Sequence, residues 1–191
     1  MENLFLVCLI PPASIVEDVD VIRNEIADQF NVRESLKRPA HITLYNPVKL
    51  SSQEQEEIFF NKLDEVVFAS PFTQVLKNFS SFPPHTVFID VEHSDGIMNI
   101  QAEINKALKS LLFLEKTNQP KFNPHLTVAF KDVKPAVFPL IMDEYKERKF
   151  KRSFEVSGFS VYKHIDKRWQ PFKEYAFKNP HEKPRPLSLF D

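Results

Sequence analysis

Two four-residue strings of this chain follow the same pattern of histidine, aliphatic residue, threonine and aliphatic residue. The first occupies residues 41–44 (HITL), and the second occupies residues 125–128 (HLTV), 84 positions later. Alternate side chains of a β-strand point to opposite faces, so each string predicts a strand with histidine and threonine on one face and aliphatic residues in the core. Because the strings lie close to half a chain length apart, the repeat predicts two related halves whose matching strands meet at a cleft.

The apolar residues around the two strings also recur in a matched order. In each half a predicted strand and an amphipathic helix precede the string, and another helix follows it. Ser14 with Glu17, and Ser51 with Glu54, have the spacing of a capping box and predict where two helices begin. The predicted elements, in chain order, are a strand at 4–10, a helix at 15–30, a strand at 41–44, a helix that includes 59–67, strands at 72–79 and 86–92, a helix at 97–112, a strand at 125–128, a helix at 138–145, and strands at 154–162 and 172–177.

Composition limits the kinds of site that the chain can carry. The 191 residues suit one domain or two small lobes, and we assign residues 1–178 to one bilobal domain and residues 179–191 to a charged, proline-containing tail. Two glycines exclude a glycine-rich phosphate loop, and the single cysteine excludes an internal disulfide and a cysteine-rich zinc site. A net charge of −1 argues against bulk binding of long nucleic acid. Without a signal sequence or a long apolar run, the chain is expected to be cytoplasmic, with no membrane partner.

Paired imidazoles suit general acid-base catalysis, because an unperturbed histidine pKa of about 6.5 lets one ring be neutral while the other is charged. With His41 and His125 facing one cyclic phosphodiester, one ring would deprotonate water and the other would protonate the departing ribose oxygen. The hydroxyls of Thr43 and Thr127 could donate hydrogen bonds to the non-bridging phosphate oxygens. This scheme needs neither a metal nor a cofactor.

Three other interpretations of the histidines are considered, of which the metal site and the binding module remain open. Two histidines could be half of a zinc site, for which His85 and His93 are further ligands by residue type only, with no metal-binding spacing to support them. A serine hydrolase has no support, because the chain lacks the glycine-flanked serine turn. A binding module could hold a nucleotide or RNA end without turnover, although arginine or lysine would serve phosphate binding better.

The two motifs resemble the signature of the two-histidine (2H) phosphoesterases, which include bacterial RNA 2′,3′-cyclic phosphodiesterases, also called 2′-5′ RNA ligases. The resemblance covers residues 1–178 and includes Trp169 in the last predicted hairpin. It implies a bilobal, pseudo-two-fold α+β fold, with antiparallel sheets lining a central cleft and helices packed outside. It also implies metal-independent attack on cyclic or 2′-5′ phosphodiesters, with a slight preference for His125 as the base.

The chain departs from the family pattern after the second motif. Many RNA-processing members continue with a small residue and then arginine, whereas here Ala129 is followed by Phe130 and Lys131. Phe130 could pack in the core or stack on a base. The further candidates for substrate contact are Tyr45, which shares a strand face with Thr43 by parity, Phe82 in a proline-rich connection, Phe130, Lys131, and Tyr162 in the last hairpin.

We therefore expect a phosphodiesterase acting on 2′,3′-cyclic phosphate termini or a similar small cyclic phosphodiester. The alternatives are a 2′-5′ oligonucleotide phosphodiesterase or RNA ligase, and the non-catalytic binding module. The expected partner is a small cyclic nucleotide or an RNA end, and the expected oligomeric state is a monomer. Residues 186–190 (PLSLF) also resemble the short peptide that docks on bacterial sliding clamps, although proline replaces the usual glutamine.

Overall fold

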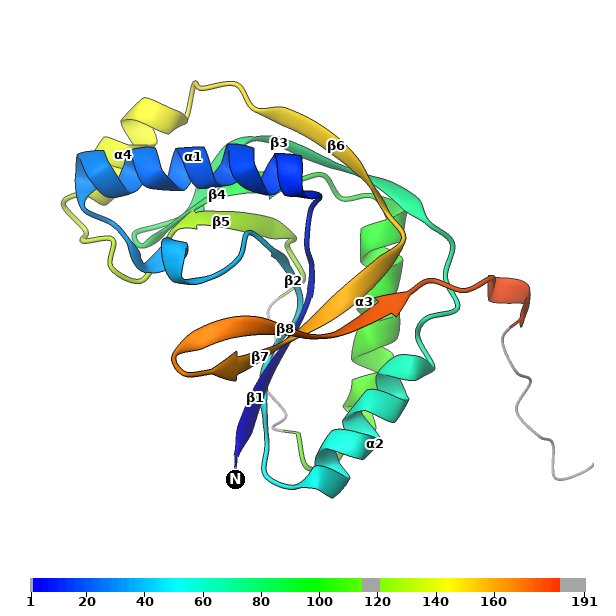
Figure 1. The fold of residues 1–191 in the computed structure, drawn as a ribbon. Coiled ribbons are helices and arrows are strands. Elements are labelled where there is room, and N and C mark those ends of the chain that lie inside the picture. The colour runs from blue at the N-terminus through cyan, green and yellow to red at the C-terminus, as the bar shows by residue number, and fades with distance from the viewer. Residues whose placement is uncertain (1, 115–120, 183–191) are drawn as a thin grey trace, which may run out of the picture.

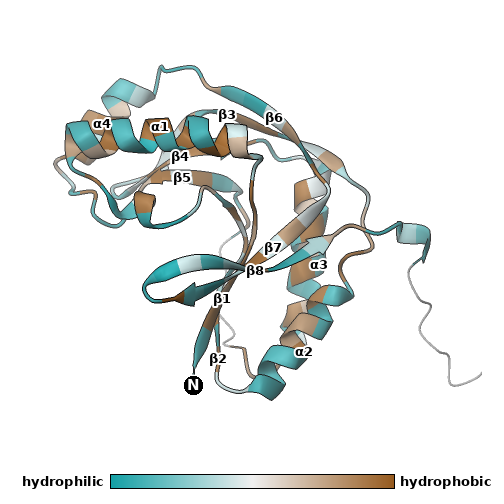
Figure 2. Ribbon diagram, in the orientation of Figure 1, coloured by the Kyte–Doolittle hydropathy of each residue, from teal (hydrophilic) through white to brown (hydrophobic). Residues whose placement is uncertain are grey.

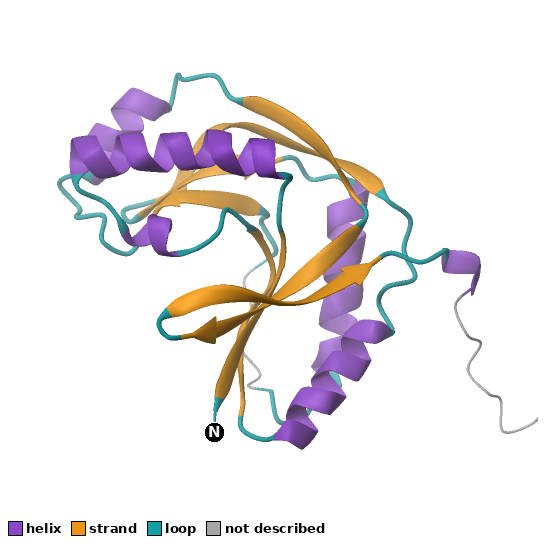
Figure 3. Cartoon of the chain, in the orientation of Figure 1, coloured by secondary structure: helices purple, strands orange, loops and turns teal. Residues whose placement is uncertain are grey.

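The computed structural model describes residues 2–114 and 121–182, so the clamp-like string at 186–190 lies outside the described residues. Its strands form one curled antiparallel sheet with the α-helices on its outer side (Figure 3). The elements are β1 (Asn3–Leu9), α1 (Ala13–Phe30), the 3₁₀-helix η1 (Glu34–Lys37), β2 (Ile42–Leu50), α2 (Gln53–Asp64), β3 (Phe72–Phe82), β4 (Thr86–Val91), α3 (Asp95–Lys109), β5 (His125–Ala129), α4 (Phe138–Tyr145), β6 (Lys151–Val156), β7 (Gly158–Ile165), β8 (Arg168–Ala176) and the 3₁₀-helix η2 (Pro180–Glu182).

The sheet has the strand order β6-β3-β4-β5-β2-β1-β7-β8, and its two halves meet where β5 lies beside β2 (Figure 1). Along the chain the first half runs β1-α1-β2-α2 and the second runs β4-α3-β5-α4, while in space α1 packs on β5 of the second half and α3 packs on β2 of the first. The predicted order of strand, helix, motif strand and helix is therefore confirmed in both halves. The predicted α+β fold, with antiparallel strands and helices packed outside, is also confirmed, and the strands of both halves join in one continuous eight-stranded sheet.

The α-helices cover one face of the sheet with apolar side chains at helical spacing. Helix α1 buries Ile15, Val19, Ile22 and Ile26, and the alternation of hydrophobic and hydrophilic bands along it is visible in Figure 2. These side chains join one large core cluster with residues from both halves of the sheet. A smaller buried cluster of Leu6, Cys8, Tyr162 and Trp169 lies on the other face of β1, so that strand is buried on both faces. In the described part of the chain, no helix is long and apolar enough to cross a membrane.

Three local predictions are corrected by the structure. Helix α1 begins at Ala13 after Pro12, whose carbonyl accepts from two backbone amides, and no side chain caps it, so the predicted capping box at Ser14 does not form. The predicted strand at 154–162 is two strands, β6 and β7, because the chain leaves one edge of the sheet and enters the other half beyond Val156. Strand β8 begins at Arg168, earlier than predicted.

The capping box of α2 lies one residue later than its predicted position. Ser52 is the N-cap, and its Oγ accepts from the backbone N–H of Gln55 at 3.2 Å. In return, the Gln55 side chain accepts from the backbone N–H of Ser51 at 2.8 Å. Thus Ser51 contributes only its backbone to the cap, while Ser52 contributes its hydroxyl.

This difference predicts unequal effects for two neighbouring substitutions. Ser52→Ala is expected to lower the free energy of unfolding by about 1 kcal/mol, because α2 loses its side-chain cap. Ser51→Ala keeps the backbone amide that Gln55 binds and is expected to change stability by less than about 0.5 kcal/mol. Denaturant unfolding of both variants measures the difference, and a larger loss for Ser51→Ala would contradict the assignment.

Candidate active site

The two motifs lie side by side at the join of the two halves. Strand β2 pairs with β5 in antiparallel register at Ile42 and Leu126, the aliphatic residues that follow the two histidines. This register brings the His41 side of one motif to the Thr127 side of the other. In both strings the histidine and threonine are half-buried and the aliphatic residues are buried, as the sequence predicts. The motif residues His41, Thr43, His125 and Thr127 all line one cavity of about 300 Å³.

Each imidazole is oriented by the same kind of hydrogen bond. The Nδ1 atom of His41 lies 2.7 Å from the carbonyl oxygen of Pro39, and Nδ1 of His125 lies 2.8 Å from the carbonyl oxygen of Asn123. A carbonyl oxygen only accepts, so Nδ1 of each ring is the donor in this contact. The Nε2 atom of each ring is then the one that can take up or release a proton.

The surroundings of the two rings differ despite this symmetry. The pKa of His41 is lowered from 6.5 to about 4, chiefly by burial and also by the positive charges of Arg23 and Arg38, against the opposing effect of its hydrogen bond to Pro39. His41 is therefore neutral at pH 7 in the free protein. The His125 ring instead lies against aromatic rings, 5.0 Å from Phe82 in an edge contact and 5.1 Å from Phe88.

Arg23 is the charged side chain behind the second motif. It projects from α1, is 1 % exposed, and donates to the carbonyl oxygen of Thr127 from Nη2 at 2.8 Å and from Nε at 3.3 Å. Its Nη1 donates to the carbonyl oxygen of Arg38 at 3.1 Å and to the Asp20 carboxylate at 3.2 Å. One buried guanidinium thus connects the strand of the second motif with the segment that leads into the first.

The charged side chains that line this cavity are basic. They are Arg23 and Arg38, and the lining contains no aspartate or glutamate among the described residues. The guanidinium of Arg38 lies over the Phe130 ring at 4.8 Å and over the Trp169 ring at 5.9 Å. A site with this charge favours an anionic ligand such as a phosphate, although the whole chain is close to neutral.

Tyr45 lies in the core and not in the cleft, which corrects the parity prediction. Thr43 pairs with Cys8 and Tyr45 pairs with Val7, so β2 has one residue more than β1 between these two pairs. Such a bulge interrupts the alternation of faces. Tyr45 consequently packs with the large core cluster, and Asn46 is the neighbour that lines the cavity.

Of the other four candidates for substrate contact, two line the cavity and two do not. Phe82 and Phe130 line the cavity. Phe82 is 39 % exposed, and its ring centroid lies 4.5 Å from that of Phe88. Lys131 is exposed, lies 4.0 Å from a Glu34 carboxylate oxygen and is absent from the cavity lining. Tyr162 is buried in the small cluster with Leu6 and does not line the cavity either.

The two histidines considered as further metal ligands are engaged elsewhere. His85 Nδ1 lies 3.1 Å from the carbonyl oxygen of Val133, and His93 Nε2 lies 3.2 Å from Oδ1 of Asn123. Across residues 2–114 and 121–182, no group of three histidine, cysteine, aspartate or glutamate side chains is placed to hold a metal ion. Cys8 is fully buried, and burial raises the pKa of its thiol.

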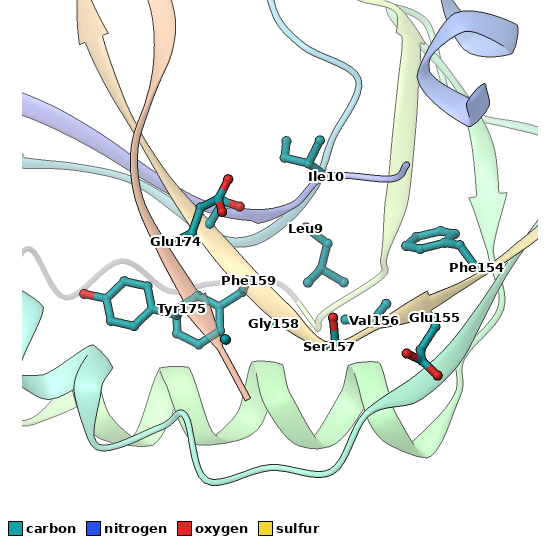
Figure 4. Close-up of a pocket in the computed structure, with 12 residues that line it drawn as sticks. Leu9, Ile10, Phe154, Glu155, Val156, Ser157, Gly158, Phe159, Glu174 and Tyr175 are labelled. Atoms are coloured by element: carbon teal, nitrogen blue, oxygen red, sulfur yellow. The ribbon is translucent and has the colours of Figure 1, made fainter. Parts of the chain in front are cut away.

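A larger hollow of about 600 Å³ lies where β6 passes into β7 (Figure 4). Its titratable side chains include the carboxylates of Glu155 and Glu174, which Figure 4 shows on opposite sides of Leu9 and Ser157. Carboxylates repel a phosphate, and no histidine of the described chain lines this hollow. The smaller cavity at the two motifs is therefore the candidate active site.

Comparison with known proteins identifies a phosphoesterase-related family, in agreement with the two motifs that line one cavity. The family model described as the 2′-5′ RNA ligase superfamily matches residues 11–168. A Bacillus pumilus (strain SAFR-032) protein named "Putative phosphoesterase" is 36% identical over 98 residues, which are 49% of this chain and 53% of that protein. The chain thus spans about half the length of this curated relative in the match.

Solved structures of the same fold cover nearly the whole chain. The apo form of LigT from E. coli has a TM-score of 0.69 at 17% identity, covering 94% of this chain and 99% of that one. The TT0787 protein of Thermus thermophilus has a TM-score of 0.70 at 15% identity, covering 94% of this chain and 100% of that one. At these identities the likeness establishes the fold.

The surroundings of His41 predict an unusual titration. Ring signals in NMR are expected to show a midpoint near pH 4 for His41 in the free protein, identified by its loss in His41→Gln. The unfolded chain takes up this proton near pH 6.5, so His41 should contribute to a loss of stability as pH falls from about 6.5 towards 4. A midpoint at or above 6.5 would contradict the inferred burial of the charged form.

Proposed function

Because the chain belongs to the 2′-5′ RNA ligase superfamily, we propose that it is a metal-independent phosphodiesterase that opens 2′,3′-cyclic phosphate termini or a similar small cyclic phosphodiester. The observation that carries this proposal is the matched pair of imidazoles on one cavity, each with Nδ1 bonded to a backbone carbonyl and Nε2 left for proton transfer. Thr43 and Thr127 supply two hydroxyls to the same cavity. One imidazole can then accept a proton and the other donate one, while the hydroxyls bind the same phosphate.

We assign His41 as the base and His125 as the acid. His41 enters the complex neutral because burial and the nearby arginines lower its pKa, and a bound phosphate anion raises that pKa towards neutrality, where a base is most effective. The assignment reverses the slight preference for His125 as the base that the family resemblance implied.

The reaction then proceeds as a single displacement at phosphorus. Water attacks the phosphorus atom while Nε2 of His41 takes its proton, and a new phosphorus–oxygen bond forms. The bond to one ribose oxygen breaks, and that oxygen takes the proton of His125. Threonine hydroxyls donate to the non-bridging oxygens as their negative charge increases.

The fold neighbours are consistent with a small nucleotide ligand. E. coli LigT has been solved in complexes with 3′-AMP, NADP+ and ATP. A nucleoside monophosphate is what ring opening of a nucleoside 2′,3′-cyclic phosphate produces, since the phosphate stays on one ribose oxygen. The 2′-5′ oligonucleotide reaction is the alternative that the family description itself offers.

Removal of either histidine is expected to lower kcat by at least about a hundredfold, the usual scale for loss of an acid or base. The test incubates wild type, His41→Ala and His125→Ala with nucleoside 2′,3′-cyclic phosphates and with 2′-5′ linked oligoadenylate, and identifies the products. Chelators should leave wild-type turnover unchanged. Full turnover by either variant would exclude the assignment, and turnover of the oligoadenylate alone would favour the alternative reaction.

A substrate with a better leaving group separates the two roles. A p-nitrophenyl ester of a nucleoside phosphate releases a phenolate that needs little protonation, so it makes the acid nearly dispensable. His125→Ala is therefore expected to recover most of its lost rate on this ester, while His41→Ala stays impaired. The opposite pattern of recovery would make His125 the base.

A further inference from the structure

The guanidinium of Arg38 lies over aromatic rings at the wall of the candidate active-site cavity. The group lies over Phe130, at the end of β5, and over Trp169, in β8, so aromatic rings from both halves of the fold contact it. An aromatic ring accepts no conventional hydrogen bond, so these contacts leave the N–H groups of Arg38 available to donate to a ligand. Such a planar donor is suited to bidentate recognition of a phosphate.

No carboxylate of the described structure forms a direct ion pair with Arg38. Burial lowers the pKa of Arg38, although the charge of Glu34 opposes this effect. Its side chain forms no ion pair and no hydrogen bond with any of residues 2–114 or 121–182. Glu34 is the nearby acidic group, but its carboxylate pairs with Lys37 and lies 4.0 Å from Lys131. By contrast, the other arginine of the cavity, Arg23, is bonded to Asp20 and to two carbonyl oxygens.

A second polar group without a partner lies on the same wall. Ser35 is 2 % exposed and lines the cavity, and its Oγ has no hydrogen-bond partner among the described residues. The backbone N–H of Arg38 donates to the Ser35 carbonyl at 3.4 Å, so the two residues are fixed relative to each other by η1. The Ser35 Oγ is closed to solvent in the free protein, so a ligand in the cavity reaches it through rotation of the side chain. Such a ligand then satisfies a hydroxyl that otherwise costs free energy.

We propose that Arg38 and Ser35 form a subsite for a second phosphate group, which the substrate carries beside the diester that reacts. This inference rests on the proposed function. The reacting phosphate already has two imidazoles and two threonine hydroxyls at the motifs, whereas the donors of Arg38 and Ser35 have no partner among the residues that the structure describes. The substrate class is therefore a nucleotide or oligonucleotide end with a phosphate next to the cyclic one, and not a bare nucleoside cyclic phosphate.

Affinity for stable product analogues tests this subsite without requiring turnover. Calorimetry would compare adenosine 3′-monophosphate with adenosine 3′,5′-bisphosphate, which differ by one phosphate. Wild type is expected to bind the bisphosphate at least about 10-fold more tightly, as a charge-assisted contact provides. In Arg38→Gln the two affinities should agree within about 2-fold, and Arg38→Lys should give an intermediate ratio because it keeps charge but loses the planar fork.

Arg33→Gln is the matched control, because Arg33 adjoins the same 3₁₀-helix, is exposed and pairs with Asp28 outside the cavity. This variant also removes one positive charge, and it should keep the wild-type ratio of affinities for the bisphosphate and the monophosphate. Ser35→Ala should lower the ratio several-fold without lowering the unfolding temperature, since its hydroxyl has no partner to lose in the described structure.

The arms of the experiment also distinguish the source of the second phosphate. The dinucleotide ApAp carries an internal diester where the bisphosphate carries a terminal phosphate. If both ligands bind more tightly than adenosine 3′-monophosphate by the same factor, the second phosphate is that of an oligonucleotide end. Equal wild-type affinity for mono- and bisphosphate would overturn the subsite, as would an Arg38→Gln variant that weakens both ligands alike. Loss of turnover on every cyclic diester with an intact affinity ratio would instead refute the proposed function and leave the subsite standing.

Discussion

The arrangement of the site depends on one buried guanidinium, that of Arg23. It projects from α1, the helix that follows β1 in the chain. It donates to the Thr127 carbonyl in the second motif and to the Arg38 carbonyl, which precedes the first motif. A carbonyl buried without a partner costs about 1–3 kcal/mol, so these bonds strongly favour one spacing of the two motifs. Asp20, in the same helix, balances the charge and lets a cation remain inside the fold.

The duplicated backbone supplies chemical groups in pairs, and the side chains around them make the pairs unequal. Both imidazoles are oriented by the carbonyl of the residue two positions earlier. His41, however, faces the charges of Arg23 and Arg38, whereas His125 lies against Phe82 and Phe88. A diester hydrolysis needs one proton acceptor and one proton donor at the same time, so an internal repeat becomes useful when its two environments diverge.

The parts of this site that follow local periodicity could be predicted from the sequence. The two motif strands and the faces of their residues follow from alternation, and the helix of each half follows from apolar spacing. Tyr45 could not be placed, because a bulge depends on the pairing of β2 with β1. A signal for Arg23 existed, since a charged residue lies within the apolar stripe of α1. No sequence pattern pointed to Arg38, because its position depends on contacts with Phe130 and Trp169, which are distant in sequence.

Net charge and local charge lead to different expectations about the substrate. The chain as a whole carries −1, yet the described lining of the candidate active-site cavity contains arginines and histidines and no carboxylate. A nearly neutral surface gives little attraction for a long polyanion, while a basic cavity selects a short anionic group. Phe130, which interrupts the usual pattern after the second motif, contributes to this selection as a flat surface under Arg38. An aromatic residue at that position therefore leaves positive charge in the cavity, because its ring contacts a cation that another segment provides.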